Sequence, residues 1–328
     1  MTKVNFITTP LKNSNSVRGV GFYTKNLLIG LKKHASDFDI DIVEDGSGEI
    51  AHYPFFDLFY HTLPISKKTK TIVTIHDVVP LEFPQIYQPG IRGTVNFNLQ
   101  KLSLLNVDRV ITDSYASVKA IHKYLKIPHE KIKLVYLAPA DHFKKLKNPK
   151  TNIKLPEKFI LYTGGINWNK NLIGLVKAAT LIKIPLVIAG KSALEIDNMD
   201  FSHSELAHLK ELSALIKSSN VTRLGFVPDE DLVNVYNLAS VYCQPSFAEG
   251  FGLPVLEALA CGTPVACSKT YSLPEIGGDD VHYFDPYNID SICAALKTAI
   301  KTGLPNPIKK FSWDQTAKQT LQVYQEIT

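Results

Sequence analysis

The 328-residue sequence lacks any apolar run long enough to cross a membrane. No stretch approaches the roughly 20 uncharged apolar residues that a spanning helix needs. The apolar run within residues 1–10 is too short for a signal peptide, and it is predicted to form a first buried strand. Hydrophobic residues make up 45% of the chain and charged residues 20%, which is the balance of an ordinary soluble globular protein.

Cysteine is scarce, and no Cys-x-x-Cys pair occurs. The four cysteines lie in the C-terminal half in apolar surroundings, at Cys243, Cys261, Cys267 and Cys293. No histidine pair accompanies them at a ligand spacing, so a zinc site is not expected. Buried, reduced thiols fit best and favour a cytoplasmic location.

The sequence also lacks a nucleic-acid-binding motif and any aromatic-basic stripe, so no nucleic-acid partner is expected. The net charge of +5 is uneven: residues 1–150 carry 21 Lys and Arg against 13 Asp and Glu, and residues 151–328 carry 15 against 18. A basic first half suits an anionic partner or peripheral contact with the inner face of a membrane. A solvated, lysine-rich surface is the simpler explanation.

Short apolar runs alternate with helical patterns along the whole chain. Strands are predicted near 3–9, 39–43, 71–75, 108–112 and 132–135, and again near 158–163, 185–190, 222–226, 241–244 and 264–267. The helices predicted around them lie near 22–34, 92–105, 115–125, 171–182, 204–218, 229–238, 254–261, 288–302 and 313–326. Val- and Ile-rich strands alternating with helices indicate an α/β fold with parallel sheets covered on both faces.

A polar stretch at residues 141–152 interrupts this pattern and is the best candidate for a domain boundary. We therefore predict two Rossmann-like, doubly wound domains, at residues 1–145 and 153–310, that face a central cleft. Residues 311–328 are predicted to form a C-terminal helix that can cross back to the first domain.

The most informative segment runs from Glu249 to Glu257, directly after the predicted strand 241–244. Pro254 suits the start of a helix, because its missing N–H would have no helical partner there, and Gly262 suits the helix end. Glu257 is then expected in the first helical turn. Both carboxylates can therefore face one pocket at the end of a strand.

Such a pocket suits a ligand that carries both phosphates and hydroxyls. Helix N-termini and glycine-rich backbone N–H groups attract phosphate, whereas ionised carboxylates accept hydrogen bonds from hydroxyls. A nucleotide sugar has both kinds of group. Either glutamate alone would be explained by the helix dipole or by surface charge, but their combination with Gly250, Gly252 and Pro254 argues against that explanation.

The string Ser-Phe-Ala-Glu-Gly-Phe-Gly-Leu-Pro-Val-Leu-Glu-Ala around this segment resembles the signature of retaining glycosyltransferases of family four, which have the two-domain GT-B fold. The resemblance implies that Glu257 binds the ribose hydroxyls of the nucleotide. It also implies that Glu249 and the backbone at Phe251, Gly252 and Leu253 surround the donor sugar.

Two other loops resemble the family in the same order along the chain. Gly19-Val-Gly21 resembles its N-terminal glycine loop, where the backbone approaches the donor phosphates. The third glycine of a dinucleotide-binding fingerprint is absent at Thr24, which weakens a dehydrogenase alternative. Asn169-Lys170 resembles the Arg-Lys pair of the family's diphosphate loop, so Lys170 is expected on the diphosphate. Asn169 stands where an arginine is usual and is expected to bind the donor as well.

The pair His76-Asp77 follows a predicted strand and resembles a motif of a subset of the family, many of them mannosyltransferases. By this resemblance His76 contacts the donor sugar or the reacting oxygens, while Asp77 fixes its tautomer or caps the loop. Phe226 and Val227 resemble the segment whose backbone meets the nucleobase. Asp113–Ser117 resembles a Ser-x-x-Ser turn, which N-capping of the next helix explains equally well.

The resemblance implies transfer of a hexose, mannose or glucose, from a nucleoside diphosphate sugar to a glycan or lipid-linked acceptor in polysaccharide or glycolipid synthesis. His76, Lys170 and Glu249 are the expected catalytic residues, and neither a cofactor nor a metal is expected. A disaccharide phosphorylase or nucleotide-sugar epimerase on the same architecture stays open, and phosphate-dependent cleavage without nucleotide would identify the former. A non-catalytic subunit that binds nucleotide sugar also stays open, because of Asn169.

Overall fold

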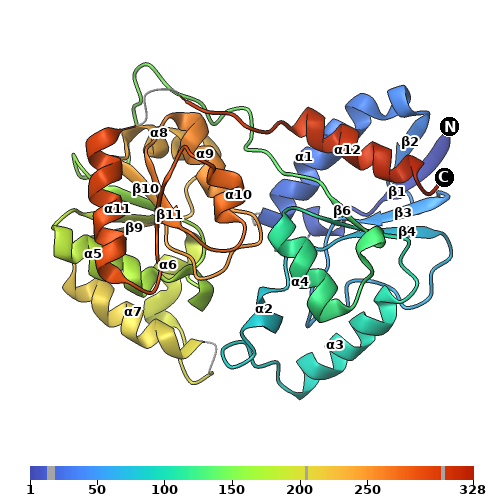
Figure 1. The fold of residues 1–328 in the computed structure, drawn as a ribbon, viewed down its shortest axis with the longest axis horizontal. Helices are drawn as coiled ribbons and strands as arrows, with labels where there is room; N and C mark the ends of the chain where they lie inside the picture. Colours follow the sequence, from blue (N-terminus) through green and yellow to red (C-terminus); the bar gives the residue numbers. More distant parts are fainter. Residues whose placement is uncertain (13–18, 204–205, 304–306) are drawn as a thin grey trace. The chain divides into compact units, whose positions relative to one another are not determined.

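The computed structural model describes residues 1–12, 19–203, 206–303 and 307–328, and it divides into two compact units (Figure 1). Unit 1 contains residues 1–84, 88–138 and 311–328, and unit 2 contains residues 85–87 and 139–310. The chain passes into unit 2 just before the polar stretch 141–152. It does so because residues 139–145 already pack there: Phe143 lies edge-on to Tyr236, and Asn237 donates a hydrogen bond to the Lys144 carbonyl.

Unit 1 is built on a parallel sheet of order β2-β1-β3-β4-β5-β6. Its strands are β1 (Thr2–Phe6), β2 (Ile40–Val43), β3 (Ile50–Tyr53), β4 (Lys70–Thr74), β5 (Arg109–Thr112) and β6 (Ile132–Leu134). Its helices are α1 (Gly19–His34), α2 (Val79–Glu82), α3 (Ile91–Leu104), α4 (Tyr115–Leu125) and α12 (Trp313–Gln325). The strand order reverses at β1, which pairs with β2 on one side and β3 on the other.

Unit 2 repeats the architecture with the sheet order β12-β11-β10-β7-β8-β9, again parallel throughout. Its strands are β7 (Ile160–Thr163), β8 (Leu186–Ala189), β9 (Val221–Gly225), β10 (Val241–Gln244), β11 (Val265–Ser268) and β12 (His282–Phe284). Its helices are α5 (Leu172–Ile182), α6 (Lys191–Glu195), α7 (Ala207–Ser218), α8 (Asp229–Leu238), α9 (Leu253–Cys261), α10 (Leu273–Gly277) and α11 (Ile289–Thr302). The predicted α/β class with doubly wound parallel sheets is therefore confirmed, and the four cysteines are buried and unpaired.

Strand β3 was absent from the sequence prediction because its centre carries a histidine. The structure buries His52 completely and gives both ring nitrogens a partner: Nδ1 lies 2.6 Å from Tyr324 Oη, and Nε2 lies 2.9 Å from Thr74 Oγ1. Burial lowers the pKa of His52 to about 3, so the ring is neutral. A neutral, fully bonded histidine can occupy a core position that the apolar pattern does not reveal.

The last helix, α12, packs against α1 and thus completes unit 1 (Figure 1). Gly30 permits the close approach, because a Cβ at this position would lie 2.8 Å from Ala317 Cβ. Thr316 donates a hydrogen bond of 2.7 Å to the Tyr136 carbonyl, and His34 Nε2 lies 2.9 Å from an Asp314 carboxylate oxygen. A helix that follows unit 2 in sequence therefore supplies part of the core of unit 1.

Candidate active site

The loops after β7 and β10 bring predicted site residues of unit 2 together. The chain leaves β7 towards β8 and β9, and it later returns to the other side of β7 as β10. The carboxyl ends of β7 and β10 thus form the point where the strand order reverses, which is where doubly wound sheets bind ligands. Lys170 follows β7 and Glu249 follows β10.

Lys170 and Glu249 form an ion pair at this position, with Lys170 Nζ 2.5 Å from Glu249 Oε2. The Lys170 side chain is 25% exposed and that of Glu249 only 7%. The second carboxylate oxygen accepts a hydrogen bond of 2.8 Å from Gln244 Nε2. Because a lysine ammonium has three donors and Glu249 takes one, the pair holds the amine in place while leaving it able to bind an anion.

Asn169, the predicted donor ligand next to Lys170, is buried and engaged in the loop itself. Its amide Nδ2 donates to the Ala248 carbonyl at 2.9 Å, and its Oδ1 accepts from the Tyr87 hydroxyl at 2.7 Å. Its backbone carbonyl accepts from Phe247 N at 2.7 Å. These bonds tie the loop after β7 to the loop after β10, so in this arrangement Asn169 positions Lys170 opposite Glu249.

The loop from Glu249 to Gly252 is held by groups that the sequence pattern did not identify as supports. The Ser272 hydroxyl lies 2.9 Å from the Glu249 carbonyl and 2.7 Å from that of Phe251. Gly252 has a φ of 109°, and a Cβ there would lie 2.8 Å from Leu273 Cδ2. Only glycine therefore fits at this turn into α9.

Glu257 lies on α9 as its fifth residue, so the prediction of a first-turn position is wrong: the helix begins at Leu253 with Pro254 second. The side chain is buried, and its Oε2 accepts a 2.8 Å hydrogen bond from the Tyr236 hydroxyl. Tyr236 Oη also lies 2.8 Å from Thr163 Oγ1. Glu249 and Glu257 therefore have separate sets of hydrogen-bond partners.

Burial raises the pKa of Glu257 to about 7, and the Tyr236 hydrogen bond only partly offsets it. From about pH 4.5 to pH 7 the folded chain holds a proton that the unfolded chain has lost, so the contribution of this group to stability falls as the pH rises. We expect Glu257→Gln, which can still accept from Tyr236, to raise the free energy of unfolding at pH 8 by up to about 3 kcal/mol.

Urea unfolding at pH 8 and pH 5 checks this prediction, since the gain should shrink at pH 5, where Glu257 is already protonated in the folded state. Glu230→Gln, at an exposed position on α8, is the matched control and should change little at either pH. Equal stability of Glu257→Gln and the wild-type chain at pH 8 would contradict the proposed cost of burial.

In unit 1, His76 and Asp113 follow the neighbouring strands β4 and β5 and meet at their carboxyl ends. His76 Nδ1 lies 2.5 Å from Asp113 Oδ2, and the Tyr23 ring packs edge-on against the imidazole at a centroid distance of 4.6 Å. Burial alone would lower the pKa of His76, but the Asp113 carboxylate outweighs it, with a smaller effect from Asp77, and raises the pKa above its usual value. His76 Nε2 is buried without a hydrogen-bond partner among the described residues.

Asp77, by contrast, caps the loop: its Oδ1 accepts from Val79 N at 3.0 Å. The sequence left the tautomer-fixing and capping roles open for Asp77, and the structure assigns the bond with the His76 ring to Asp113. Ser114 is the N-cap of α4, accepting from Ser117 N at 3.0 Å, so the predicted cap is confirmed. Asp113 was missed as a partner of His76 because only strand pairing makes the two neighbours.

The remaining predicted residues lie at element ends. Gly19 and Gly21 occupy the first turn of α1, after residues that lie outside the described part of the chain. Phe226 and Val227 follow β9, the first 61% exposed and the second buried. Nothing in the geometry assigns them a ligand.

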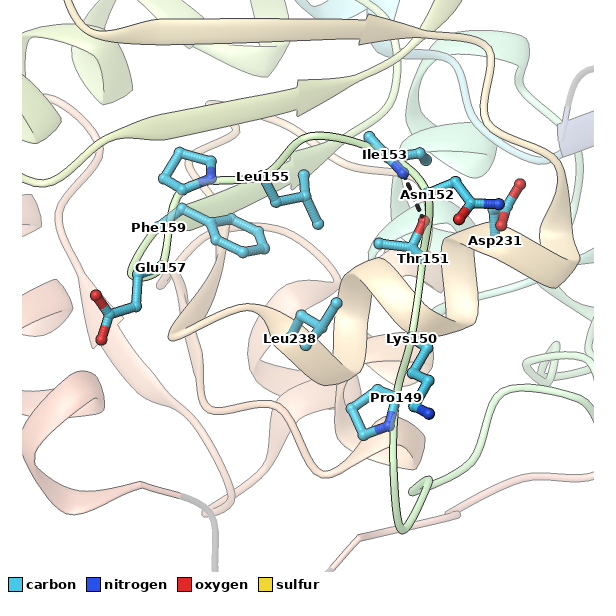
Figure 2. Close-up of a pocket in the computed structure, with 11 residues that line it drawn as sticks. Pro149, Lys150, Thr151, Asn152, Ile153, Leu155, Glu157, Phe159, Asp231 and Leu238 are labelled. Atoms are coloured by element: carbon cyan, nitrogen blue, oxygen red, sulfur yellow. Dashed lines mark hydrogen bonds between the residues drawn. The ribbon is translucent and has the colours of Figure 1, made fainter.

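A cavity of about 760 Å³ lies in another part of unit 2, where residues 149–157 pass α8. Figure 2 shows Leu155 and Phe159 of the extended segment on one side and Leu238 of α8 on the other. This segment precedes β7, so the cavity lies towards the amino end of that strand, whereas Lys170 and Glu249 follow carboxyl ends. It is therefore separate from the ion pair at the switch point.

Residues 143–319 match the family of glycosyl transferases group 1, and residues 8–138 match glycosyltransferase family 4. The chain belongs to the group 1 glycosyl transferases. This transferase is 31% identical to the O-antigen chain mannosyltransferase B of Escherichia coli over 78% of its own length and 70% of that protein. It is 28% identical to the serotype-specific mannosyltransferase WbdA of Escherichia coli over 77% of its length, but it spans only 33% of WbdA.

Solved structures show that the transferase has the GT-B fold. Sucrose-phosphate synthase from Thermosynechococcus elongatus aligns over 98% of this chain and 82% of its own, with a TM-score of 0.63 at 20% identity. Anabaena Alr3699/HepE in complex with UDP and glucose aligns over 100% and 99%, with a TM-score of 0.63 at 14% identity. The family match gives glycosyl transfer as the class of reaction of this chain, and the solved structures give its fold class.

Proposed function

We propose that this transferase moves a hexose, with mannose the first candidate, from a nucleoside diphosphate sugar to a hydroxyl of a growing surface polysaccharide or glycolipid. The observation that carries the proposal is the Lys170–Glu249 ion pair at the point where the strand order of unit 2 reverses. The choice of mannose is supported by the similarity to O-antigen mannosyltransferases and by the His76-Asp77 pair. The four buried thiols suit a reducing, cytoplasmic compartment.

Lys170 and the backbone of the glycine-rich turn into α9 would bind the diphosphate. A diphosphate carries more charge than the Glu249 carboxylate, so it competes for the amine and frees Glu249 to accept bonds from sugar hydroxyls. Glu257 would accept hydrogen bonds from the ribose hydroxyls. These hydroxyls would join or replace the Tyr236 hydroxyl, which donates to Glu257 in the structure. Unit 2 would then hold both the nucleotide and Lys170, the cation that stabilises the leaving diphosphate.

The reaction would proceed with retention at the anomeric carbon. The bond from that carbon to the diphosphate oxygen breaks and its electron pair leaves with the diphosphate, whose growing charge Lys170 stabilises. The acceptor oxygen forms the new bond on the same face and gives its proton to the leaving phosphate oxygen. Because lysine and backbone N–H groups carry the counter-charge, we propose that no metal ion is needed.

A thermal-shift panel of UDP, GDP, ADP and their sugars tests this proposal. The correct nucleotide at 100 times its Kd should raise the free energy of unfolding by about 2.7 kcal/mol. Transfer from the matching sugar should be unchanged by EDTA, and the product should keep the anomeric configuration of the donor by proton NMR. Loss of activity in EDTA, restored by Mg²⁺, would contradict the metal-free mechanism, and no shift with any of these ligands would contradict the donor class.

A further inference from the structure

Helix α3 of unit 1 packs Leu104 into the hydrophobic core, but it also buries polar side chains and exposes apolar ones. Gln100 and Ser103 are fully buried, whereas Ile91 is 89% exposed, Leu102 51% and Leu105, directly after the helix, 70%. In a helix that only covers a core, apolar residues face inward and polar residues outward. The exposed apolar residues of α3 are therefore typical of a surface that contacts a partner or a membrane.

The exposed apolar side chains, together with the exposed Asn98, follow one line along the helix. Ile91, Val95, Asn98, Leu102 and Leu105 are spaced four, three, four and three residues apart, which places them on one stripe of a 3.6-residue helix. Val95 is 53% exposed, and Asn98 is exposed as well. We call these five residues the α3 stripe.

The inner face of α3 carries polar side chains beside the core residue Leu104, because the segment 57–67 runs along it and needs hydrogen-bond partners. Gln100 Nε2 donates to the Asp57 carbonyl at 2.6 Å, and Gln100 Oε1 accepts from Leu63 N at 3.3 Å. Asn96 Nδ2 donates to the Phe59 carbonyl at 2.9 Å, and Lys67 Nζ reaches the Ser103 carbonyl at 2.5 Å. Folding thus accounts for the buried polar side chains, but it does not explain why the exposed α3 stripe is mostly apolar.

The surroundings of the α3 stripe are cationic. Residues 57–70 and 88–106 contain five Lys and Arg and one acidic residue, Asp57, whose carboxylate accepts from Phe59 N and Tyr60 N. One of the five, Lys67, is bonded to backbone carbonyls, and the other four, Lys68, Lys70, Arg92 and Lys101, are exposed. Arg92 and Lys101 belong to α3 itself, so apolar and cationic side chains share its outer face.

We propose that α3 docks on an anionic lipid surface, with the α3 stripe inserted at the headgroup boundary and Arg92 and Lys101 against lipid phosphates. Interfacial helices combine an apolar stripe with cations in this way. A second copy of the chain fits less well, because a symmetric contact through α3 would bring Arg92 and Lys101 of both copies together, and α3 itself has no carboxylate to neutralise them. No helix among the described residues is long and apolar enough to span a bilayer, so this contact would be peripheral.

Co-sedimentation with vesicles of phosphatidylcholine, alone or mixed with phosphatidylglycerol, tests the proposal. The wild-type chain should sediment with the anionic vesicles and be released by added salt. Leu102→Ser and Leu105→Ser should each weaken the partition by about tenfold. Arg92→Gln and Lys101→Gln should each weaken it about fivefold.

Matched controls come from exposed positions in unit 2. Leu181→Ser, at a leucine that is 62% exposed on α5, and Lys297→Gln, at an exposed lysine on α11, should bind vesicles like the wild-type chain. Circular dichroism identifies any variant that fails to fold. If a leucine variant fails to fold, Arg92→Gln and Lys101→Gln still test the proposal.

Three results would overturn lipid docking. They are a wild-type chain that stays in solution with anionic vesicles, α3 variants that bind as well as the unit 2 controls, and binding that is equal on neutral vesicles. Sedimentation velocity distinguishes the second-copy alternative: self-association that the leucine variants abolish, without vesicle binding, would make the α3 stripe a dimer contact. Each of these results leaves the proposed glycosyl transfer untouched.

Discussion

Lys170→Ala is expected to lower kcat for glycosyl transfer by about 10²–10³-fold, the loss typical of removing one group that stabilises a developing anion. The physical reason is that Lys170 is the side-chain cation at the carboxyl ends of β7 and β10, where the diphosphate would leave. Glu249→Ala is expected to be comparably damaging, because it removes the proposed sugar ligand and the partner that fixes the amine. Single-turnover assays with a saturating donor measure both effects on the chemical step.

The ion pair complicates a simple reading of Lys170→Ala, because the variant leaves Glu249 buried without its cation. Such a change costs on the order of 3–5 kcal/mol of stability. We therefore expect the double variant Lys170→Ala/Glu249→Gln to recover stability while staying inactive. Lys177→Ala is the matched control, since Lys177 forms an exposed pair of 2.7 Å with Glu211 on the same unit. A double variant that recovers turnover would exclude Lys170 from the chemistry.

Asp113→Asn is expected to lower kcat by about tenfold to a hundredfold and to move a limb of the pH–rate profile. The carboxylate stabilises the charged imidazole of His76 against its burial, so its loss should lower the pKa of His76. The limb that belongs to His76 should then shift towards acid pH, whereas a purely structural loss would lower the rate at every pH alike. Measuring kcat from pH 5 to pH 9 distinguishes the two.

Asp77→Asn provides the comparison for this shift. Asp77 also raises the pKa of His76, but less than Asp113 does, and its side chain accepts from Val79 N. The His76 limb of the pH–rate profile should therefore move less in Asp77→Asn than in Asp113→Asn. An equal or larger shift for Asp77→Asn, or an unmoved limb for Asp113→Asn, would contradict the assignment of Asp113 as the residue that positions His76.

The sequence predicted every described helix longer than five residues and most of the strands, and it missed the shortest helices. Continuous apolar runs such as 241–244 and amphipathic stretches such as 288–302 match β10 and α11, because burial on one face imposes its period on the sequence. Strands β3 and β12 and helices α2, α6 and α10 were missed. The three helices have only four or five residues, too few for a helical period to appear, and β3 was missed because of its central His52.

In the candidate site of each unit, the sequence identified the residues expected to carry the chemistry but not their partners. Lys170, Glu249 and His76 were predicted from local motifs, because each follows a strand in a recognisable loop. The Lys170–Glu249 pair joins residues 79 positions apart, and the His76–Asp113 pair joins residues 37 apart. A local sequence motif spans far fewer residues, so it cannot show that such distant residues pair.

The sequence by itself determined the fold class, the family and the groups expected to carry the reaction, because these depend on local periodicity and contiguous motifs. The tertiary structure alone decided which carboxylate holds His76, that Glu249 neutralises Lys170 while Glu257 bonds to Tyr236, and that the α3 stripe is exposed. The physical reason is that strand order sets which loop ends become neighbours. Charge, burial and hydrogen bonding act between neighbours in space, however far apart they lie in the chain.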